Sequence, residues 1–542
     1  MAVTWPRLAP LGDRGLLVEF PPEVSPEINA LVRGADAALA ALPGVVETVP
    51  TFRSVLVVYD PLRVRFQELV ERADACARAA RPAPHASGAV VEIPVVYGGP
   101  DGPDLEAVAQ AVGLTPDDVV RLHSQPTYLV YMLGFAPGYA YLGLLSPALR
   151  LPRRATPRLR VPAGSVAIAD MFAGIYPQET AGGWHLLGRT WRQLFDPDRD
   201  EPTLLRPGDQ VRFVPVPSEA RTVATSLRAK RVPPSSRPVF EVLEGGLMTT
   251  VQDLGRRGWR RWGIPASGAL DAGALRAANA AVGNHQAAAG LEVTFPGPRL
   301  RIVAETEIAV AGADLAATLN GAEIAHATAT RVRPGDRLAF EKPRSGQWMY
   351  LSVAGGIDVP VVLGSRSTFA RGGLGGMAGH PVRAGDVLGA GEGRSGRRTT
   401  ALPPAPAPAG GAVRVILGPQ AEAFTTDAQA GLLGRPFKFT VHRDRSGTRL
   451  RGRPLEHRAG ADILSDGILP GAIQVPADGG PLVILADGPT TGGYAKIASV
   501  ISADHDRLAQ RTPGETVRFE AVTVAQAHEL LRDQTNAPTT RP

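Results

Sequence analysis

Hydrophobic and polar positions predict a small α/β unit at the start of the chain. Leucine- and valine-rich runs typical of strands alternate with stretches whose apolar residues recur at helical spacing, in the order 16–20, 25–42, 55–59 and 66–80. Ser25 is a preferred N-cap residue, and Pro26 suits the first position of a helix. We therefore expect residues 1–83 to form a small α/β subdomain.

The rest of the sequence predicts a protein built mainly from short strands. A strand over 90–96 precedes two short helices, and the second begins at Thr115 with a cap, a proline and acidic residues in its first turn. After about residue 128, short apolar runs are separated by turns. The 61 glycines and 50 prolines among 542 residues favour such turns over long helices. The expected fold class is mainly β with an α/β N-terminal subdomain.

A degenerate motif, a Pro-Gly turn that leads into an alternating strand, recurs along the chain. Three clear copies and one weaker copy occupy 206–213, 333–340, 512–519 and 383–388. We interpret them as parts of related all-β modules, closed barrels that end in the same turn and strand. The alternative is that Pro-Gly-Asp is simply a common turn sequence.

Linkers rich in proline, alanine and serine divide the chain into four predicted units. These linkers span 81–88, 231–238 and 402–411. The units are the α/β subdomain, one barrel, and two halves of a further barrel region, over residues 1–83, 88–217, 239–395 and 412–530.

The composition limits the classes of partner. The 58 basic and 52 acidic residues give a net charge of +6 without a basic run, so we expect no nucleic-acid-binding surface. Residues 1–15 lack the apolar segment of a signal peptide, and no stretch of about 18 uncharged apolar residues exists to span a membrane. The single cysteine, Cys76, excludes a disulfide framework and fits a reducing cytoplasm.

Several common catalytic and cofactor motifs are absent from the sequence. The chain has only four lysines: Lys230, Lys342, Lys438 and Lys496. None follows a glycine, as a Walker A lysine does, and none stands beside a methionine, as a biotin-carrying lysine does. The histidines lack zinc-ligand spacing, and there is no Gly-x-Ser-x-Gly elbow. Residues 373–378 faintly mimic a dinucleotide-binding loop, but a turn follows where a helix should begin. We therefore predict no dedicated metal site.

Two segments of the N-terminal half combine glycines, aromatic residues and single polar groups. They cover 131–143 and 174–190, and their candidate binding residues are Pro137, Gly138, Tyr139, Gly182, Gly183, Trp184, Arg189 and Thr190. Glycines let a backbone approach a ligand closely, and Arg189 is suited to hold a carboxylate or phosphate. The alternative is a set of tight barrel corners with packed aromatic rings.

Two further segments lie in the C-terminal half. The first, 249–294, carries polar residues at irregular spacing: Gln252, Asp253, Arg256, Ser267, Asp271, Asn279, Asn284 and Glu292. Residues 276–282 should be helical, with Gly283 as the C-cap. The second segment, 487–496, follows a buried strand and offers hydroxyls, glycines and a lysine for an oxyanion or phosphate: Thr490, Thr491, Gly492, Gly493, Tyr494 and Lys496. The alternatives are capping and turn roles for the first segment and an ordinary surface lysine for the second.

These four segments together identify a family resemblance. The motifs FAPGYAYLG (135–143) and GGWHLLGRT (182–190) resemble the KipI, or allophanate hydrolase subunit 1, family. The motifs TVQDLGR (250–256), GIPASGALD (263–271) and TTGGY (490–494) resemble the KipA, or allophanate hydrolase subunit 2, family. Further KipA-like motifs at 363–368, 444–450 and 471–476 add the candidates Arg366, Ser367, Asp444, Arg449 and Gln474. The resemblance covers residues 1–530 in collinear order, as in a fusion of the two proteins.

Five residues at three places depart from the family motifs. Phe172-Ala173, Thr180-Ala181 and Ser446 replace the usual Gln-Thr, Ser-Pro and methionine. They put individual ligand contacts in question rather than the fold.

The resemblance implies cyclophilin-like β-barrels in tandem and one of three activities. We favour an ATP-dependent 5-oxoprolinase component, equivalent to fused B and C subunits, that activates 5-oxoproline for a separate, LamB/YcsF-like A subunit. The alternatives are a carboxyltransferase that moves CO₂ from carboxybiotin to urea or a related amide, and a regulatory binding module that inhibits a histidine kinase. A homo-oligomer is compatible with each activity.

The favoured activity assigns roles to the candidate residues. Lys496 and Arg449 would stabilise the transferring phosphoryl group, and the backbone of 490–493 would cradle it. Arg189 would hold the substrate carboxylate. Asp271 or Glu292 would bind Mg²⁺ or accept a proton.

Overall fold

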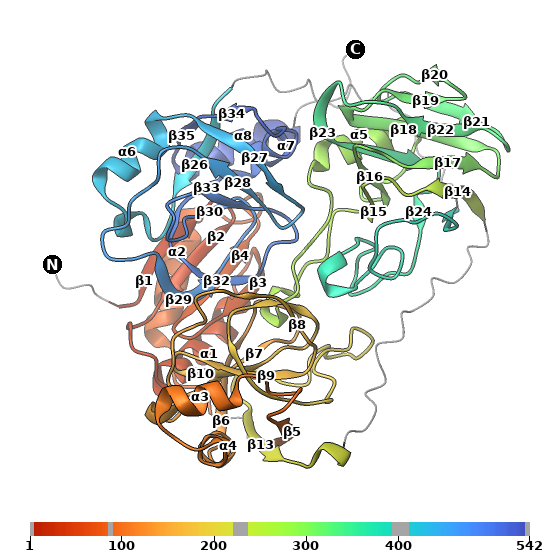
Figure 1. Cartoon of the computed structure of the whole chain (residues 1–542). Coiled ribbons are helices and arrows are strands. Elements are labelled where there is room, and N and C mark those ends of the chain that lie inside the picture. Colours follow the sequence, from red (N-terminus) through yellow and green to blue (C-terminus); the bar gives the residue numbers. More distant parts are fainter. Residues whose placement is uncertain (1–4, 85–89, 221–236, 393–410, 537–542) are drawn as a thin grey trace.

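The computed structural model of the chain describes residues 5–84, 90–220, 237–392 and 411–536. Half of the predicted linker 81–88 and most of the linkers 231–238 and 402–411, together with residues 1–4 and Lys230, lie outside these ranges. In Figure 1, the red N-terminal unit lies between a blue C-terminal barrel and an orange-to-yellow barrel, and a green unit lies to one side.

The N-terminal unit is the predicted α/β fold. Its antiparallel sheet has the order β1-β2-β4-β3, and its strands and helices are β1 (Arg7–Leu11), β2 (Gly15–Glu19), α1 (Pro26–Ala40), β3 (Val45–Pro50), β4 (Ser54–Tyr59) and α2 (Phe66–Ala79). Ser25 caps α1 as expected, because its side chain accepts a hydrogen bond from the Ile28 N–H. The helices cover one face of the sheet, while Leu17 and Leu56 on the other face pack against Ile468 of the C-terminal barrel.

A closed seven-stranded barrel follows, with strand order β10-β7-β6-β13-β5-β12-β9. The elements of this unit are β5 (Val91–Tyr97), α3 (Leu105–Val112), α4 (Pro116–Ser124), β6 (Tyr128–Leu133), β7 (Ala140–Gly143), β8 (Arg158–Val161), β9 (Ser165–Ala169), β10 (Phe172–Ile175), β11 (Thr180–Gly182), β12 (His185–Arg189) and β13 (Gln210–Pro215). Thr115 caps α4 through the Asp118 N–H, as expected. The predicted barrel is therefore confirmed for this part of the chain.

The middle unit differs from the barrel expected over 239–395, because a seven-stranded and a five-stranded sheet share one core. Its elements are β14 (Pro238–Glu244), β15 (Met248–Gln252), α5 (Ala272–Ala281), β16 (Gly290–Thr294), β17 (Arg299–Ile302), β18 (Thr306–Asp314), β19 (Ala317–Leu319), β20 (Ala322–Glu323), β21 (Thr330–Val332), β22 (Arg337–Phe340), β23 (Ser345–Val353), β24 (Ile357–Asp358) and β25 (Val387–Ala390). Helix α5 starts four residues before the predicted 276, because the Asp271 side chain caps it.

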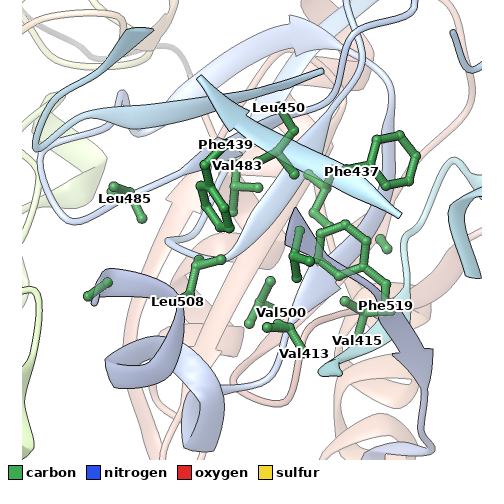
Figure 2. Close-up of a cluster of buried hydrophobic side chains, with 14 of the residues drawn as sticks. Val413, Val415, Phe437, Phe439, Leu450, Val483, Leu485, Val500, Leu508 and Phe519 are labelled. Atoms are coloured by element: carbon green, nitrogen blue, oxygen red, sulfur yellow. The ribbon is translucent and has the colours of Figure 1, made fainter. Parts of the chain in front are cut away.

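The C-terminal unit is a curled sheet with strand order β34-β27-β28-β31-β30-β33-β26-β35. Its elements, including three helices that the hydrophobic pattern did not predict, are β26 (Val413–Leu417), α6 (Thr426–Gly434), β27 (Phe437–Arg443), β28 (Gly447–Arg451), β29 (Asp462–Gly467), β30 (Ala472–Gln474), β31 (Leu482–Ile484), β32 (Thr491–Tyr494), β33 (Lys496–Val500), α7 (His505–Ala509), β34 (Thr516–Val517), β35 (Phe519–Ala521) and α8 (Val524–Asn536). Only Arg518 separates the two end strands along the chain, so the two edges of the curled sheet come close together and the sheet is barrel-like. Figure 2 shows its core, where Phe437, Phe439 and Leu450 meet Val415 and Phe519.

The repeated Pro-Gly motif forms the same turn in all four places. In each copy the last residue of the turn, Asp or Glu, accepts a hydrogen bond from the backbone N–H three residues earlier, and the glycine has a φ between +89° and +98° (Gly208, Gly335, Gly385 and Gly514). The strands that follow are β13, β22, β25 and β34. In the first barrel, the strand after this turn, β13, runs parallel to the first strand, β5. In the C-terminal unit, the strand that runs parallel to the first strand, β26, is β35, which follows β34 after Arg518.

Helices are short in every unit. No helix within the described ranges is long and apolar enough to cross a bilayer.

Candidate functional site

Three of the motif segments meet at a junction between the two halves of the chain. The loop between β6 and β7 carries Phe135, whose N–H donates to the Thr491 hydroxyl at 3.2 Å, and Gly138, whose N–H donates to the Trp262 carbonyl at 3.0 Å. A Cβ atom on Gly134 would lie 2.0 Å from the Thr491 Oγ1, so only glycine allows this approach. The N-terminal motif is thus held directly by both C-terminal motifs.

Aromatic side chains from the two N-terminal segments pack together beside this junction. The Tyr139 ring makes edge contacts with Phe135, Tyr141, Tyr176 and Trp184, with centroids 5.0–5.9 Å apart. Burial raises the pKa of the Tyr141 and Tyr176 hydroxyls to about 12, so they stay neutral. The aromatic packing predicted as the alternative is therefore present, and it forms an uncharged wall on the N-terminal side.

The predicted glycines at 182 and 183 support this wall. A Cβ on Gly182 would lie 2.3 Å from the Tyr176 hydroxyl, and the carbonyl of Gly183 accepts a hydrogen bond from the Arg154 N–H. Gly182 therefore has a packing role, and Gly183 contributes a backbone hydrogen bond. Pro137 lies in the same loop as Phe135 and Gly138.

A chain of polar contacts links the second N-terminal segment to the C-terminal barrel. Gln178 donates to the Arg371 carbonyl at 2.7 Å, and the Arg371 guanidinium pairs with Asp444 at 2.8 Å. The other oxygen of Asp444 accepts hydrogen bonds from the backbone of Ser446 and Gly447, which shapes the tip of the β27–β28 hairpin.

Arg445, at the same hairpin tip, is the centre of a buried ion-pair network. Its guanidinium binds Glu292 of β16, Asp487 at 2.9 Å, and the Gly268 carbonyl at 2.7 Å. Burial alone lowers the pKa of Arg445, but Asp487 and Glu292 outweigh this effect and raise it, so the charge is fixed. Glu292 also accepts a hydrogen bond from the Tyr350 hydroxyl at 2.6 Å. This network ties the middle unit to the C-terminal barrel.

Asp271 lies next to this network as the N-cap of α5. One oxygen accepts from the Ala274 N–H at 2.7 Å, and the other accepts from Gln510 at 2.7 Å. Burial, and then the nearby carboxylate of Asp506, raise the pKa of Asp271 to about 8. The capping role, one of the alternatives that the sequence left open for this segment, is therefore real.

Arg256 is a buried cation with unused hydrogen-bond donors. It is 1% exposed, and its Nη2 donates to the Ser367 carbonyl, whereas Nε and Nη1 have no hydrogen-bond partner among the described residues. Burial lowers its pKa to about 10, against the opposite pull of Asp487 and Asp253, so it stays charged. The hydroxyl of Ser267, also buried, likewise has no partner among these residues. Unused buried donors of this kind are what an anionic ligand requires.

Asp253 organises the loop that contacts Arg256. Its carboxylate accepts hydrogen bonds from the Ser365 and Ser367 hydroxyls at 2.6 and 2.5 Å, and from the Arg366 N–H at 2.7 Å. The Arg366 guanidinium points elsewhere, to Asp358 at 3.2 Å. Asp253 and Arg256 of the 249–294 segment are thus connected to Ser367 of the 363–368 motif.

Lys496 is fully buried and is not a surface lysine. Its ammonium pairs with Asp466 of β29, whose second oxygen accepts a hydrogen bond from Gln420 at 2.9 Å. Burial raises the pKa of Asp466, and the Lys496 charge opposes that rise.

Sequence reasoning missed the acidic and basic residues around Lys496. A small cavity of about 40 Å³ lies beside Asp466, and Glu19 and Arg53 of the N-terminal unit form its other side. Glu19 accepts hydrogen bonds from Arg7 and Arg53, both at 3.1 Å, and burial raises its pKa. The available signal was Glu19 itself, a charged residue within the apolar run of a buried strand.

The segment Thr490–Tyr494 was expected to be a phosphate cradle, but the structure places most of it in a strand. Strand β32 pairs with β29, and the Gln474 side chain donates to the Tyr494 carbonyl at 3.2 Å. A Cβ on Gly492 would lie 3.1 Å from Gln474, and one on Gly493 would lie 3.2 Å from the Ile463 carbonyl. The buried Thr490 hydroxyl has no partner among the described residues, so it is the free group of this segment.

The structure does not bring Arg449 to Lys496. Lys496 on β33 and Arg449 on β28 lie in the same row across the sheet, with Gln474 of β30 and Leu482 of β31 between them. Three strand spacings therefore separate the backbones of Lys496 and Arg449 by about 14 Å. Arg449 pairs instead with Asp478 on the outside of the barrel. A shared action on one phosphoryl group is therefore not supported.

Four other candidates make contacts within their own units. Arg189 is exposed and donates to the Ala163 carbonyl at 2.8 Å, and the Thr190 hydroxyl accepts from the Arg192 N–H. Asn279 donates to the Ala288 carbonyl at 2.8 Å, and Gln252 donates to the Thr368 carbonyl at 3.1 Å. None of these contacts reaches the junction, so we assign these residues structural roles.

The described ranges contain no group of three or more His, Cys, Asp or Glu side chains arranged to hold a metal ion. The carboxylates of Asp271 and Glu292 are both engaged by protein donors, as described above.

Comparisons with known proteins agree with this division into two halves. Residues 6–205 match the family model described as carboxyltransferase domain, subdomain C and D, and residues 262–521 match subdomain A and B. The chain is 36% identical over 304 residues to the C subunit of the 5-oxoprolinase of Escherichia coli, with 55% of this chain and 95% of that protein covered. It is 42% identical over 217 residues to the B subunit of the 5-oxoprolinase of Bacillus subtilis, with 38% of this chain and 90% of that protein covered.

Larger proteins and solved structures share the same regions. The urea amidolyase of Lachancea kluyveri is 35% identical over 321 residues, which are 54% of this chain but only 17% of that protein. The crystal structure of TTHA0988 superposes with a TM-score of 0.83 and 39% identity, covering 94% of this chain and 99% of that one. The structure of the Kluyveromyces lactis urea amidolyase gives a TM-score of 0.53 at 33% identity, over 60% of this chain and 21% of that one.

Proposed function

Because this chain belongs to the carboxyltransferase-domain family, which includes the B and C subunits of 5-oxoprolinase, we propose that it is a cytoplasmic component of an ATP-dependent 5-oxoprolinase. In this proposal it combines the work of both subunits. It activates 5-oxoproline with ATP, and a separate A subunit completes ring opening to glutamate.

The observation that carries the proposal is the junction between the halves. The regions similar to the B and C subunits occur in one chain, and each covers at least 90% of the relative named above. The contacts of Phe135 with Thr491 and of Gly138 with Trp262 join their motifs. A site assembled from both regions explains why both are retained together.

Arg256 is the residue best suited to bind the substrate carboxylate. Its buried guanidinium keeps two unused N–H donors, Nε and Nη1, which face different directions, so each can donate a separate charge-assisted hydrogen bond. It replaces Arg189 in this role, since Arg189 is exposed on the first barrel. The Ser267 and Thr490 hydroxyls are further unused donors for the lactam or the phosphate.

The proposed chemistry is phosphorylation of the lactam oxygen. That oxygen attacks the γ-phosphorus of ATP, the bond to the β,γ-bridging oxygen breaks, and ADP leaves with its electron pair. The ring carbon becomes more electrophilic, so that water adds to it. The C–N bond of this adduct then breaks, which releases the amine and leaves an acyl phosphate, and a second water hydrolyses the acyl phosphate to glutamate and phosphate. Arg256 supplies positive charge to the site, whereas Arg445 and Lys496 are each paired with carboxylates and position the residues around it. Mg²⁺ in this proposal accompanies ATP, whose phosphates provide most of its ligands.

The test is ADP release by the purified chain with ATP and Mg²⁺, with and without 5-oxoproline and an A subunit. The proposal expects ADP release that requires 5-oxoproline, and glutamate only when the A subunit is added. Absence of ADP in every combination would contradict it. Arg256→Gln should raise the KM for 5-oxoproline more than about tenfold, as expected for loss of a charge-assisted contact.

A second candidate function is carboxyl transfer from carboxybiotin to urea or a related amide. It is supported by the identity to urea amidolyase over 54% of the chain. Both the biotin carboxylase and the biotin carrier would have to come from other proteins. Urea-dependent decarboxylation of carboxybiotin by the chain, without ADP formation, would favour this function.

A further inference from the structure

A broad groove on the outer face of the C-terminal barrel has no role in the site described above. Its volume is about 690 Å³, within the range of small-molecule sites. It lies over β27 and β28, and the rim includes Pro454, Pro513 and Gly514. A second hollow of about 440 Å³ adjoins it and shares Pro454 and Asp478.

The groove is lined by basic side chains that the barrel core leaves on its outer face. Phe439 and Leu450 pair across β27 and β28 and point into the core in Figure 2. Because side chains alternate along a strand, Lys438 and Arg451 point outward, and both are exposed. Arg449 lies on the same outer face.

Lys438 and Arg451 form an unfavourable pair. They are direct cross-strand partners, and neither side chain has a hydrogen-bond or ion-pair partner among the described residues. Like charges directly opposite each other in a sheet are destabilising. Arg449 adds a third cation, and Asp478 is the only carboxylate among the described residues that line the groove. The groove thus concentrates positive charge without the counter-charge to balance it.

We propose that this groove binds the oligophosphate of a nucleoside triphosphate. Lys438 and Arg451 bind the phosphates, and an anion between them removes their repulsion. Val441, 78% exposed, and Pro513 offer apolar surface for a base. The identification of the anion as a nucleotide rests on the proposed ATP-dependent function, whereas the anion site itself does not.

The position of the groove connects it to the junction. Arg449 and Arg445 are four residues apart on the same hairpin, about 13 Å along the strand. The hairpin therefore carries the anion groove on its outer face and the Glu292–Arg445–Asp487 network at its tip.

The test compares the full chain with the Lys438→Gln/Arg451→Gln double variant, and Arg299→Gln serves as a control at an exposed arginine on β17 of the middle unit. Thermal unfolding is measured at constant ionic strength with tripolyphosphate and, separately, with ATP. Both probes should stabilise the wild-type chain and the control, and the double variant should bind them about tenfold more weakly or worse. Without any anion, the double variant should melt at or above the wild-type temperature, because the repulsion is gone.

Other outcomes separate the anion site from the proposed function. If tripolyphosphate acts through these residues but ATP does not, the nucleotide assignment is overturned. If neither probe shifts the wild type, or the double variant responds like the control, the groove is not an anion site. If neither tripolyphosphate nor ATP shifts the unfolding temperature and the double variant no longer binds the A subunit, the groove binds an acidic protein partner. This result would overturn the proposal. Substrate-dependent ADP release that is unchanged in the double variant would place the nucleotide elsewhere and leave the proposed function standing.

Discussion

The two barrels of this chain have the same closing strand but different side chains at the junction. In the first barrel, the Pro-Gly turn leads directly to a strand, β13, that runs parallel to the first strand, and in the second barrel the parallel strand, β35, follows one short strand later. The first barrel contributes neutral aromatic rings such as Tyr139 and Trp184, whereas the second contributes charged groups such as Arg445 and Lys496. In the proposed function, one scaffold provides the shape of the site and the other provides its electrostatics, so we expect neither barrel to be sufficient alone.

The largest effect should come from removing the buried charge of the second barrel. Lys496→Met should abolish substrate-dependent ADP release and lower the free energy of unfolding by about 3–5 kcal/mol, because Asp466 is left buried without its partner. Urea denaturation and an ADP assay measure the two effects.

The double variant Lys496→Met/Asp466→Asn separates the two roles of the lysine. It removes both charges, so much of the lost stability should return while activity stays absent. Full activity in this folded double variant would show that Lys496 acts only through packing.

A change in the first barrel should affect stability by a different mechanism. Trp184→Ala removes edge contacts with Tyr139 and Tyr141 and leaves a cavity, at a cost of about 3 kcal/mol. The loss should be nearly the same at low and high salt, as expected for an uncharged wall. A strong salt dependence of the difference between variant and wild type would contradict the division of roles between the barrels.

The pH dependence of stability should reveal the buried carboxyl group of Asp271. Its pKa is about 8 in the folded chain, whereas that of an unfolded aspartate is 3.8. Between pH 3.8 and about pH 8, the folded state therefore binds one proton more than the unfolded state. The resulting stability is present below about pH 4 and is lost as pH rises towards 8. Asp271→Asn keeps a capping side chain. Relative to the wild type, it should gain at least about 1 kcal/mol of stability between about pH 5 and pH 8.

Urea titrations of both proteins at the two pH values give this difference. The groups that face Asp271 are Asp506, Gln510, Glu292 and Tyr350. A difference that does not change with pH would mean that Asp271 is ionised in the folded chain.

The smallest effect should come from the repeated turn. Gly335→Ala and Gly514→Ala meet no steric obstacle but force a non-glycine residue to a φ near +95°, which costs about 1 kcal/mol each. Thermal melts should give similar losses for both. Unequal losses would show that the copies of the turn are not equivalent.

Much of the fold followed from local signals in the sequence. Ser25 and Thr115 cap helices as expected, and the Pro-Gly turns are all formed, because caps and turns depend on a few adjacent residues. Helix α8 was not predicted, because it is a short amphipathic stretch that follows the last strand motif of the chain. The two sheets of the middle unit were also missed, because barrel closure depends on contacts between distant strands.

The candidate site was predicted in part. Asp253, Arg256 and Ser367 come together as their motifs suggested. Lys496 stays a prediction as a site residue, and its partner Asp466 and the nearby Glu19 were not predicted, because burial of a charge depends on tertiary packing. Arg449 and Arg189 carried the right charge, yet their strands direct them to the outside of the barrels.

The most direct test of the composite site is hydrogen–deuterium exchange of the full chain with 5-oxoproline and a non-hydrolysable ATP analogue. The account predicts that ligand slows exchange together in 131–143 of the first half and in 253–268 and 487–494 of the second. Protection confined to one half would contradict a site built from both.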